Sequence, residues 1–217
     1  VPILTAMCAA SPIVEGRPSG YKSFRSHIWT RTDPARCGLP DCFFKPNFTF
    51  SDYVDYALDV PLFFIERGGQ MLRADGLTFR KFLEQGFQGH SANLEDWTRH
   101  LTFLFPEVRL KGYIEIRCCD RLPDCMSFAV AALIKALLYS PPTLEETEKW
   151  LAGITAASAR AGLAEAARSG YEGLFEGKAL RTSEDFRQAY GEARAFGKAL
   201  AKRGKGSGFM KNLMEQR

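Results

Sequence analysis

The clearest alternation of hydrophobic and polar positions lies in residues 111–117. Successive side chains of a strand point to opposite faces, so the two isoleucines of this stretch share one face. Tyr113, Glu115 and Arg117 share the other face. The pattern therefore predicts a short strand that presents an acid and a base side by side.

Helical spacing of apolar residues, together with capping residues, predicts several helices around this strand. A helix is expected to end within residues 6–13, whereas residues 21–29 show no clean period. Further helices are predicted at residues 51–58 with Ser51 as N-cap, at 78–85 closed by Gly86, at 93–104 with Asn93 as cap, and at 124–139. A strand at residues 60–66 is expected to turn through residues 67–70 into a second strand at 71–74.

The composition of the chain changes after Pro142, where aromatic residues become rare and alanine and charged residues increase. Helical periodicity predicts helices at residues 144–151, 154–167 and 183–203, with no strand. We therefore expect two domains, residues 1–140 and a helical appendage at residues 141–217. The glycine-rich run at 204–208 lacks the residue order of a phosphate-binding loop and is expected to be part of a flexible tail.

Charge and hydropathy exclude two classes of protein for the body of the chain. The formal net charge of +4 is matched by residues 202–217, which carry five basic side chains and one acidic side chain. The remainder is neutral and lacks the basic face of a nucleic-acid-binding protein. No apolar run approaches the ~20 residues needed to span a bilayer. The start does not resemble a secretory signal, so no membrane partner is expected.

Six cysteines bear on the expected compartment: Cys8, Cys37, Cys42, Cys118, Cys119 and Cys125. The adjacent Cys118 and Cys119 suit no ordinary disulfide framework. The spacings also lack the paired C-x2-C of structural zinc sites. Reduced thiols in a cytoplasmic protein are therefore the expectation.

Glu115 and Arg117 are the first candidates for chemistry. A carboxylate can hold a divalent cation, and a neighbouring guanidinium can hold the phosphate that this cation neutralises. The alternative is a solvated surface ion pair, which contributes little to stability. The pair by itself favours the surface ion pair, and the rest of the chain shifts the balance toward a functional site.

Seven separated motifs accompany this pair in one order. They are Phe24-Arg-Ser-His-Ile-Trp-Thr30, Thr32-Asp33, Tyr53-Val-Asp-Tyr-Ala-Leu-Asp-Val-Pro61, Phe79-Arg-x-Phe-Leu83, Asp96-Trp97 with His100-Leu-Thr102, Phe105-Pro-Glu-Val-Arg-Leu-Lys111 and Tyr113-Ile-Glu-Ile-Arg117. In order and spacing, the motifs resemble the plant-and-bacterial type of glutamate–cysteine ligase over about residues 1–140. The C-terminal part resembles the helical region of that family only weakly.

The resemblance implies an α+β fold, with part of a glutamine-synthetase-like antiparallel sheet, flanking helices and a C-terminal helical region. It also implies a ligase that depends on ATP and Mg²⁺. In that family, ATP phosphorylates the side-chain carboxylate of glutamate, and the amine of cysteine displaces the phosphate. The product is γ-glutamylcysteine, the first intermediate of glutathione synthesis.

The resemblance also assigns roles to individual residues. Glu115 matches the metal-ligating carboxylate of the family, and Arg117 matches its phosphate-contacting, catalytic guanidinium. Arg25 lies where the family clamps the carboxylate of glutamate. Phe63 lies where the family often places a tyrosine that lines the cysteine pocket, and it lacks the hydroxyl of that tyrosine. Trp29 is expected to help wall the site.

The chain departs from the family pattern in two ways. Cys118-Cys119-Asp120 replaces the usual Gly-Ala-Asp after the arginine of the strand. The N-terminal half of the family, with further metal-ligating carboxylates and much of the ATP site, would precede Val1. The expected partners are therefore glutamate, cysteine, ATP, and either a second copy of the chain or a chain that supplies the N-terminal half. Two alternatives stay open, a non-catalytic or partial subunit that completes a site on another chain, and a related carboxylate–amine ligase with a different amine substrate.

Overall fold

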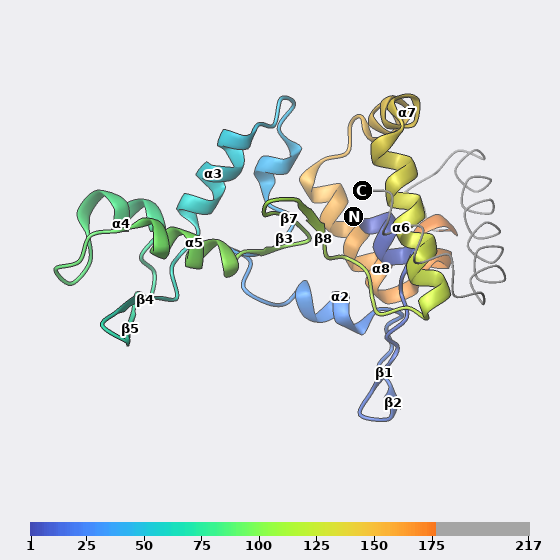
Figure 1. Ribbon diagram of the computed structural model, residues 1–217. Helices are drawn as coiled ribbons and strands as arrows, with labels where there is room; N and C mark the ends of the chain where they lie inside the picture. Colours follow the sequence, from blue (N-terminus) through green and yellow to red (C-terminus); the bar gives the residue numbers. More distant parts are fainter. Residues whose placement is uncertain (177–217) are drawn as a thin grey trace, which may run out of the picture.

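The computed structural model describes residues 1–176, in which helices and short strands form an α+β fold (Figure 1). The helices are α1 (Pro2–Met7), α2 (Phe24–Trp29), the 3-10 helix η1 (Asp41–Phe44), α3 (Phe50–Asp59), α4 (Phe79–Gln85), α5 (Leu94–Thr102), α6 (Asp124–Tyr139), α7 (Pro141–Leu151) and α8 (Ala156–Glu176). The strands are β1 (Ile13–Val14), β2 (Arg17–Pro18), β3 (Cys37–Gly38), β4 (Phe64–Arg67), β5 (Gln70–Arg73), β6 (Phe105–Pro106), β7 (Val108–Leu110) and β8 (Ile114–Ile116). In the described residues the strands pair two by two: β1–β2, β4–β5 and β7–β8 are antiparallel, and β3–β6 is parallel. The predicted α+β class is confirmed.

The β7–β8 hairpin continues the short β3–β6 pair and contains the strand predicted from the sequence. Its register places Arg109 opposite Glu115. Next to it, the Arg117 N–H donates to the Glu107 carbonyl (2.8 Å), and the Glu107 N–H donates to the Gly38 carbonyl (2.8 Å). Because opposite residues of antiparallel strands share a face, the charged residues 107, 109, 115 and 117 lie on one face. The strand is shorter than predicted, since residues 111–113 connect β7 to β8.

Helix α8 holds the N-terminal segment and the start of α2 in place. Its small residues pack against Ala6 of α1, and it also buries Leu39. The N–H groups of Lys22 and Ser23 donate to the Ala167 carbonyl, at 3.1 and 2.9 Å. Figure 1 shows α8 running beside α1 near the N-terminus. The predicted domain boundary after residue 140 falls between α6 and α7 and stays a prediction.

A second core lies at the opposite end of the molecule, around the β4–β5 hairpin and α4 (Figure 1). Its buried residues are Leu62, Ile65, Ala74, Phe79 and Phe82. Helix α3 connects this end to the charged hairpin, because the Tyr53 hydroxyl accepts a hydrogen bond from the Leu110 N–H (3.2 Å). Helix α3 thus links the second core to the β7–β8 hairpin.

Several predicted elements are confirmed where local signals are strong. The β4–β5 hairpin forms as predicted, and α6 spans Asp124–Tyr139. Helix α5 begins after Asn93, whose side chain accepts a hydrogen bond from the Asp96 N–H (2.9 Å). Helix α4 ends at Gly86, which has a φ of +70° and where a Cβ would lie 2.7 Å from the His90 carbonyl oxygen. Glycine is therefore required at that helix end.

Predictions near the N-terminal helices were partly wrong. Helix α3 is capped by Thr49 and not by Ser51, because Thr49 forms a capping box with Asp52. Helix α2 was not predicted, and Ser23 caps it. Helix α1 ends at Met7, early in the segment that was expected to contain a helix end.

Helices α7 and α8 confirm the helices predicted at residues 144–151 and 154–167, and the two prolines stand at the start of α7. The helix predicted at 183–203 and the tail at 204–208 lie outside the described residues. Within residues 1–176, no single helix has the length and hydropathy to cross a bilayer. The helices Met126–Tyr139 and Pro141–Leu151 have the required length and hydropathy only when they are counted together, and they are bent by 90° relative to each other.

Candidate functional site

The charged face of the β7–β8 hairpin carries two acids and two bases in alternation. Arg109 Nε donates to Glu115 Oε2 at 2.6 Å, and Arg117 Nη1 lies 3.6 Å from the same oxygen. The buried Arg109 also donates to the Leu104 carbonyl at 3.0 Å, which fixes its guanidinium. The hydrogen bond from Arg109 holds the pKa of Glu115 below its usual value. Glu115 is therefore an ionised carboxylate bound mainly by Arg109.

Sequence reasoning missed Glu107 and Arg109, which complete this face. A signal was present, because Glu107-Val-Arg109 and Glu115-Ile-Arg117 repeat the same acid-x-base pattern on the two sides of the Gly112 turn. In an antiparallel hairpin, such a repeat places each acid opposite a base. The sequence therefore indicated a four-residue charged face and not only a pair.

Glu107 is the most deeply buried member of the face, with 3% of its surface exposed. Its Oε2 has no hydrogen-bond partner in the described part of the chain. Burial raises the pKa of Glu107, and the positive charges of Arg25 and Arg117 counteract this rise. An unpaired buried carboxylate is costly, so this oxygen marks a place where a donor is missing.

Helix α2 brings Arg25 and Trp29 to the same place. The helix starts at Ser23, whose hydroxyl accepts from the Ser26 N–H (3.2 Å). Arg25 Nη2 donates to the Arg117 carbonyl, whereas its buried Nη1 has no partner among the described residues. The guanidinium carbons of Arg25 and Arg117 lie 6.0 and 5.6 Å from the Trp29 ring centroid. The structure thus brings together Arg25, Trp29, Glu115 and Arg117, the residues to which the resemblance gives roles in a site, and those roles stay predictions.

Asp120 joins the end of the hairpin strand to α2. Its carboxylate accepts hydrogen bonds from the Ala10 N–H (2.8 Å), the Ser11 hydroxyl (2.7 Å) and the Ser23 hydroxyl (2.8 Å). The residue is 6% exposed, and Ser23 is the cap of the helix that carries Arg25 and Trp29. Asp120, the acid that this chain shares with the family pattern, therefore helps to position helix α2.

Of the two neighbouring cysteines, Cys118 is buried and Cys119 is partly exposed. Cys118 is 1% exposed, and its carbonyl accepts from the Thr5 hydroxyl (3.3 Å). A hydrogen bond to Cys119 and burial both raise the pKa of the Cys118 thiol. Cys118 therefore stays protonated and packs between the hairpin and α1.

Phe63 lies apart from this cluster. Its ring packs edge-on against Phe103 (5.3 Å between centroids), and the Arg36 guanidinium stacks 3.7 Å from its centre. Arg36 is buried and donates to the Pro61 carbonyl at 2.9 Å. The ring is 42% exposed, so part of it faces solvent. Its expected role in a cysteine pocket stays a prediction.

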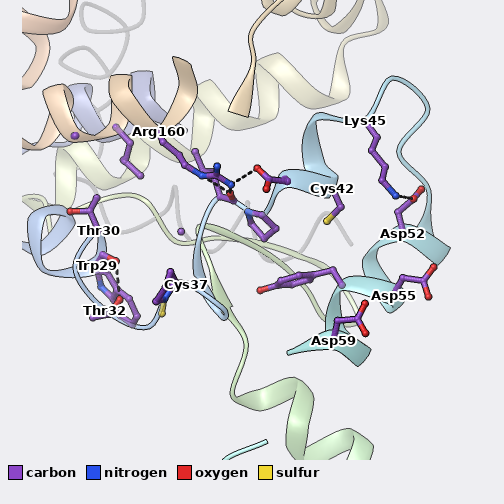
Figure 2. A pocket seen from close by; sticks show the side chains of 18 residues that line it. Trp29, Thr30, Thr32, Cys37, Cys42, Lys45, Asp52, Asp55, Asp59 and Arg160 are labelled. Carbon is purple, nitrogen blue, oxygen red and sulfur yellow. Dashed lines mark hydrogen bonds and ion pairs between the residues drawn. The ribbon is translucent and has the colours of Figure 1, made fainter. Parts of the chain in front are cut away.

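A cavity of about 860 Å³ lies beside the cluster, between α3, α8, η1 and the end of α2. Figure 2 shows Trp29, Thr30 and Cys37 on one side of it, with Asp55 and Asp59 across the opening. Glu115, Arg117 and Arg25 do not line it. Trp29 is the residue that this cavity and the charged cluster share.

Glu115 is the expected ligand of Mg²⁺, so the number of oxygen donors around it matters. Residues 1–176 contain no group of three or more His, Cys, Asp and Glu side chains that could hold a metal ion. Glu115 binds Arg109 and Arg117 through Oε2. Magnesium usually takes one or two carboxylates together with substrate phosphates and waters. Glu115 therefore fits as one contributing ligand and not as a complete metal site.

Two arginines around an indole, next to a strand with alternating charges, form a cluster whose chemistry suits anionic carboxylate or phosphate groups. Comparison with known protein families shows to which family the chain belongs. The model of glutamate–cysteine ligase family 2 (GCS2) matches residues 1–213. The chain belongs to glutamate–cysteine ligase family 2.

Curated relatives agree with this assignment. The chain is 46% identical over 147 residues to a chloroplastic glutamate–cysteine ligase of Brassica juncea, covering 66% of this chain and 29% of that one. It is 43% identical over 158 residues to the enzyme of Nicotiana tabacum, covering 70% and 30%, respectively. It is 45% identical over 147 residues to that of Arabidopsis thaliana, covering 66% and 28%. The chain thus spans less than a third of the length of the curated relatives that it matches.

The expectation of a cytoplasmic protein is contradicted by these relatives, which are chloroplastic enzymes. The expectation rested on cysteines that fit no disulfide framework. Such cysteines indicate a reducing compartment, but they do not distinguish one reducing compartment from another.

Proposed function

We propose that this protein takes part in the ATP-dependent ligation of the γ-carboxylate of glutamate to the amine of cysteine, through an acyl phosphate. The observation that carries the proposal is the family match over residues 1–213. The clustering of Arg25, Trp29, Glu115 and Arg117 supports it, because these residues lie 92 positions apart at the extremes and still meet.

The two arginines supply what this chemistry needs most. Arg117 would contact the phosphoryl group, because a guanidinium matches the geometry of phosphate oxygens. Arg25 would clamp a carboxylate of glutamate with its unpaired Nη1. Trp29 stacks on both guanidinium groups and would keep water away from them. Phe63 would contribute an apolar wall for the side chain of cysteine.

Glu115 would hold Mg²⁺ through the carboxylate that Arg109 orients. When bound with ATP, the ion supplies positive charge that neutralises the phosphoryl group during transfer. The hydrogen bond from Arg109 keeps Glu115 ionised, which a ligand of a divalent cation requires.

A second candidate function is that of a partial subunit, which completes an active site on another chain. Two observations favour it: the chain spans less than a third of its relatives, and residues 1–176 hold no complete set of metal ligands. A third candidate is a ligase for another amine, which the replacement of the family tyrosine by Phe63 favours.

One assay separates these candidates. The purified chain is incubated with ATP, Mg²⁺, glutamate and cysteine, and γ-glutamylcysteine is measured by mass spectrometry beside phosphate release. Glycine, alanine and 2-aminobutyrate replace cysteine in parallel. Product from the chain alone supports the ligase, and product only after co-expression with the N-terminal portion of the Brassica juncea relative supports the partial subunit. Faster turnover with another amine supports the third candidate.

The variant Arg117→Lys serves as the site control in this assay, with Arg121→Lys as its match on an exposed position. Lysine keeps the charge but loses the planar fork and the stacking on Trp29. We expect a loss of turnover only for Arg117→Lys. Equal turnover of both variants, or no product under any condition, would contradict the proposal.

A further inference from the structure

A second cavity, of about 620 Å³, lies between α3, α4, α5 and the end of β7. Figure 1 shows these helices at the end of the molecule away from α8. Arg25, Glu115 and Arg117 do not line this cavity, and neither does any other residue of α2 or β8. The cavity is therefore separate from the charged cluster, and what it binds does not depend on the proposed ligation.

The walls of this cavity are mostly apolar, and several of their side chains reach solvent. Phe50 is 70% exposed, Leu83 60% and Leu94 78%. Trp97 and Leu101 also line the cavity and are half-buried. A ligand that covers these side chains removes apolar surface from water, which favours binding.

The polar groups of the walls leave one cation for a ligand. The Tyr53 hydroxyl already accepts from the Leu110 N–H (3.2 Å), and the Asn93 side chain accepts from the Asp96 N–H (2.9 Å). Among the described residues that line the cavity, only Lys111 is charged. It is exposed and forms no ion pair in the described part of the chain. Its ammonium group is therefore available to an anion.

The size and the lining of the cavity together select a class of ligand. Sites for small molecules typically have a volume of about 300–1,000 Å³, with apolar walls and a few polar groups. A protein partner typically covers about 800 Å² of surface and meets several hydrogen-bonding groups. One cation beside an apolar cavity of this volume matches a small apolar molecule with one anionic end.

We propose that this cavity binds a fatty acid, with the acyl chain against α3, α4 and α5 and the carboxylate at Lys111. The acyl chain provides most of the affinity, because each methylene group that it buries strengthens binding about fourfold. The carboxylate contributes about threefold to fivefold, because an ion pair with an exposed lysine is largely solvated.

The first test is titration calorimetry of the unaltered chain with octanoate and decanoate, below their critical micelle concentrations. One molecule should bind per chain, and decanoate should bind about fifteenfold more tightly than octanoate, since it has two more methylene groups. This comparison needs no variant and no turnover.

Variants at exposed positions then place the ligand in the cavity. Leu83→Gln should weaken decanoate binding about tenfold, whereas Met71→Gln, on β5 and similarly exposed, should not change it. Lys111→Gln should weaken the binding of decanoate about threefold to fivefold and leave that of decanol unchanged. The matched control is Lys81→Gln, because Lys81 is an exposed lysine of α4 that does not line the cavity.

Three results would overturn the proposal. They are the absence of decanoate binding, equal affinities for octanoate and decanoate, and equal losses in Leu83→Gln and Met71→Gln. Sedimentation velocity is measured beside the titrations. A dimer that dissociates in Leu83→Gln, without decanoate binding, would assign the cavity to a second copy of the chain instead. None of these results bears on the proposed ligase.

Discussion

Replacing Asp120 tests how the charged hairpin is held against α2. In Asp120→Ala, three donors lose their acceptor: the Ala10 N–H and the hydroxyls of Ser11 and Ser23. The peptide N–H cannot reorient, so its loss costs about 1–3 kcal/mol. Each hydroxyl can rotate toward another acceptor and is expected to cost about 0.5–1 kcal/mol. We therefore expect a total destabilisation of about 3 kcal/mol, a large part of the typical 5–15 kcal/mol of a folded domain.

The assay is urea unfolding followed by tryptophan fluorescence, with the free energy of unfolding extrapolated to water. Asp124→Ala is the matched control, because Asp124 is an exposed acid four positions further on. Asp120→Asn should fall between wild type and Asp120→Ala, since the amide oxygen keeps part of the acceptor capacity. If Asp120→Ala unfolds within about 0.5 kcal/mol of Asp124→Ala, the carboxylate does not hold the hairpin in place.

Three further predictions concern activity and pH. Glu115→Gln should lower kcat severely at every Mg²⁺ concentration, and near-normal turnover would remove Glu115 from the metal site. Arg25→Ala should raise the KM for glutamate at least about tenfold through the lost charged contact, whereas the exposed Arg31→Ala should leave it unchanged. Burial lowers the pKa of His100, whose Nε2 lies 2.8 Å from the Ala57 carbonyl oxygen, so the unfolded chain takes up a proton first as the pH falls below about 6.5. Stability should therefore decrease between pH 7 and pH 5 in the wild type and less steeply in His100→Gln, and equal slopes in urea unfolding would refute this role.

Local signals in the sequence predicted the elements that depend on a few neighbouring residues. The cap at Asn93 and the stop at Gly86 are properties of one helix turn each, and both are present. The cap of α3 was misplaced by two residues, because Ser51 and Thr49 are both good caps. Only Thr49 has an acid three positions later that completes the capping box.

Long-range contacts of the site could not be derived from spacing alone. Arg25 meets the carbonyl of Arg117 through helix α2, which shows no clear hydrophobic period and depends on Ser23 and α8 for its place. Resemblance to the family placed Arg25 and Arg117 in one site, but it did not predict this contact. It did not supply the contact of Phe63 with Arg36, which depends on how the loop before β4 packs.

Arg109 and Arg117 interact with Glu115 to different extents, and this difference determines which N–H groups of Arg117 are available to a ligand. Arg109 lies 2.6 Å from the Glu115 carboxylate, and Arg117 lies 3.6 Å from it. Arg109 therefore supplies most of the neutralisation of Glu115, at a distance where a charged hydrogen bond is strong. Arg117 makes no hydrogen bond to a carboxylate within the described residues and rests on the rings of Trp29 and Phe105, both 5.6 Å away. A guanidinium held by aromatic stacking, with its N–H groups not consumed by an acid, is suited to receive an anionic substrate group. In the proposed function, the acid-x-base repeat thus gives Arg109 a role in the fold and leaves Arg117 to bind the substrate.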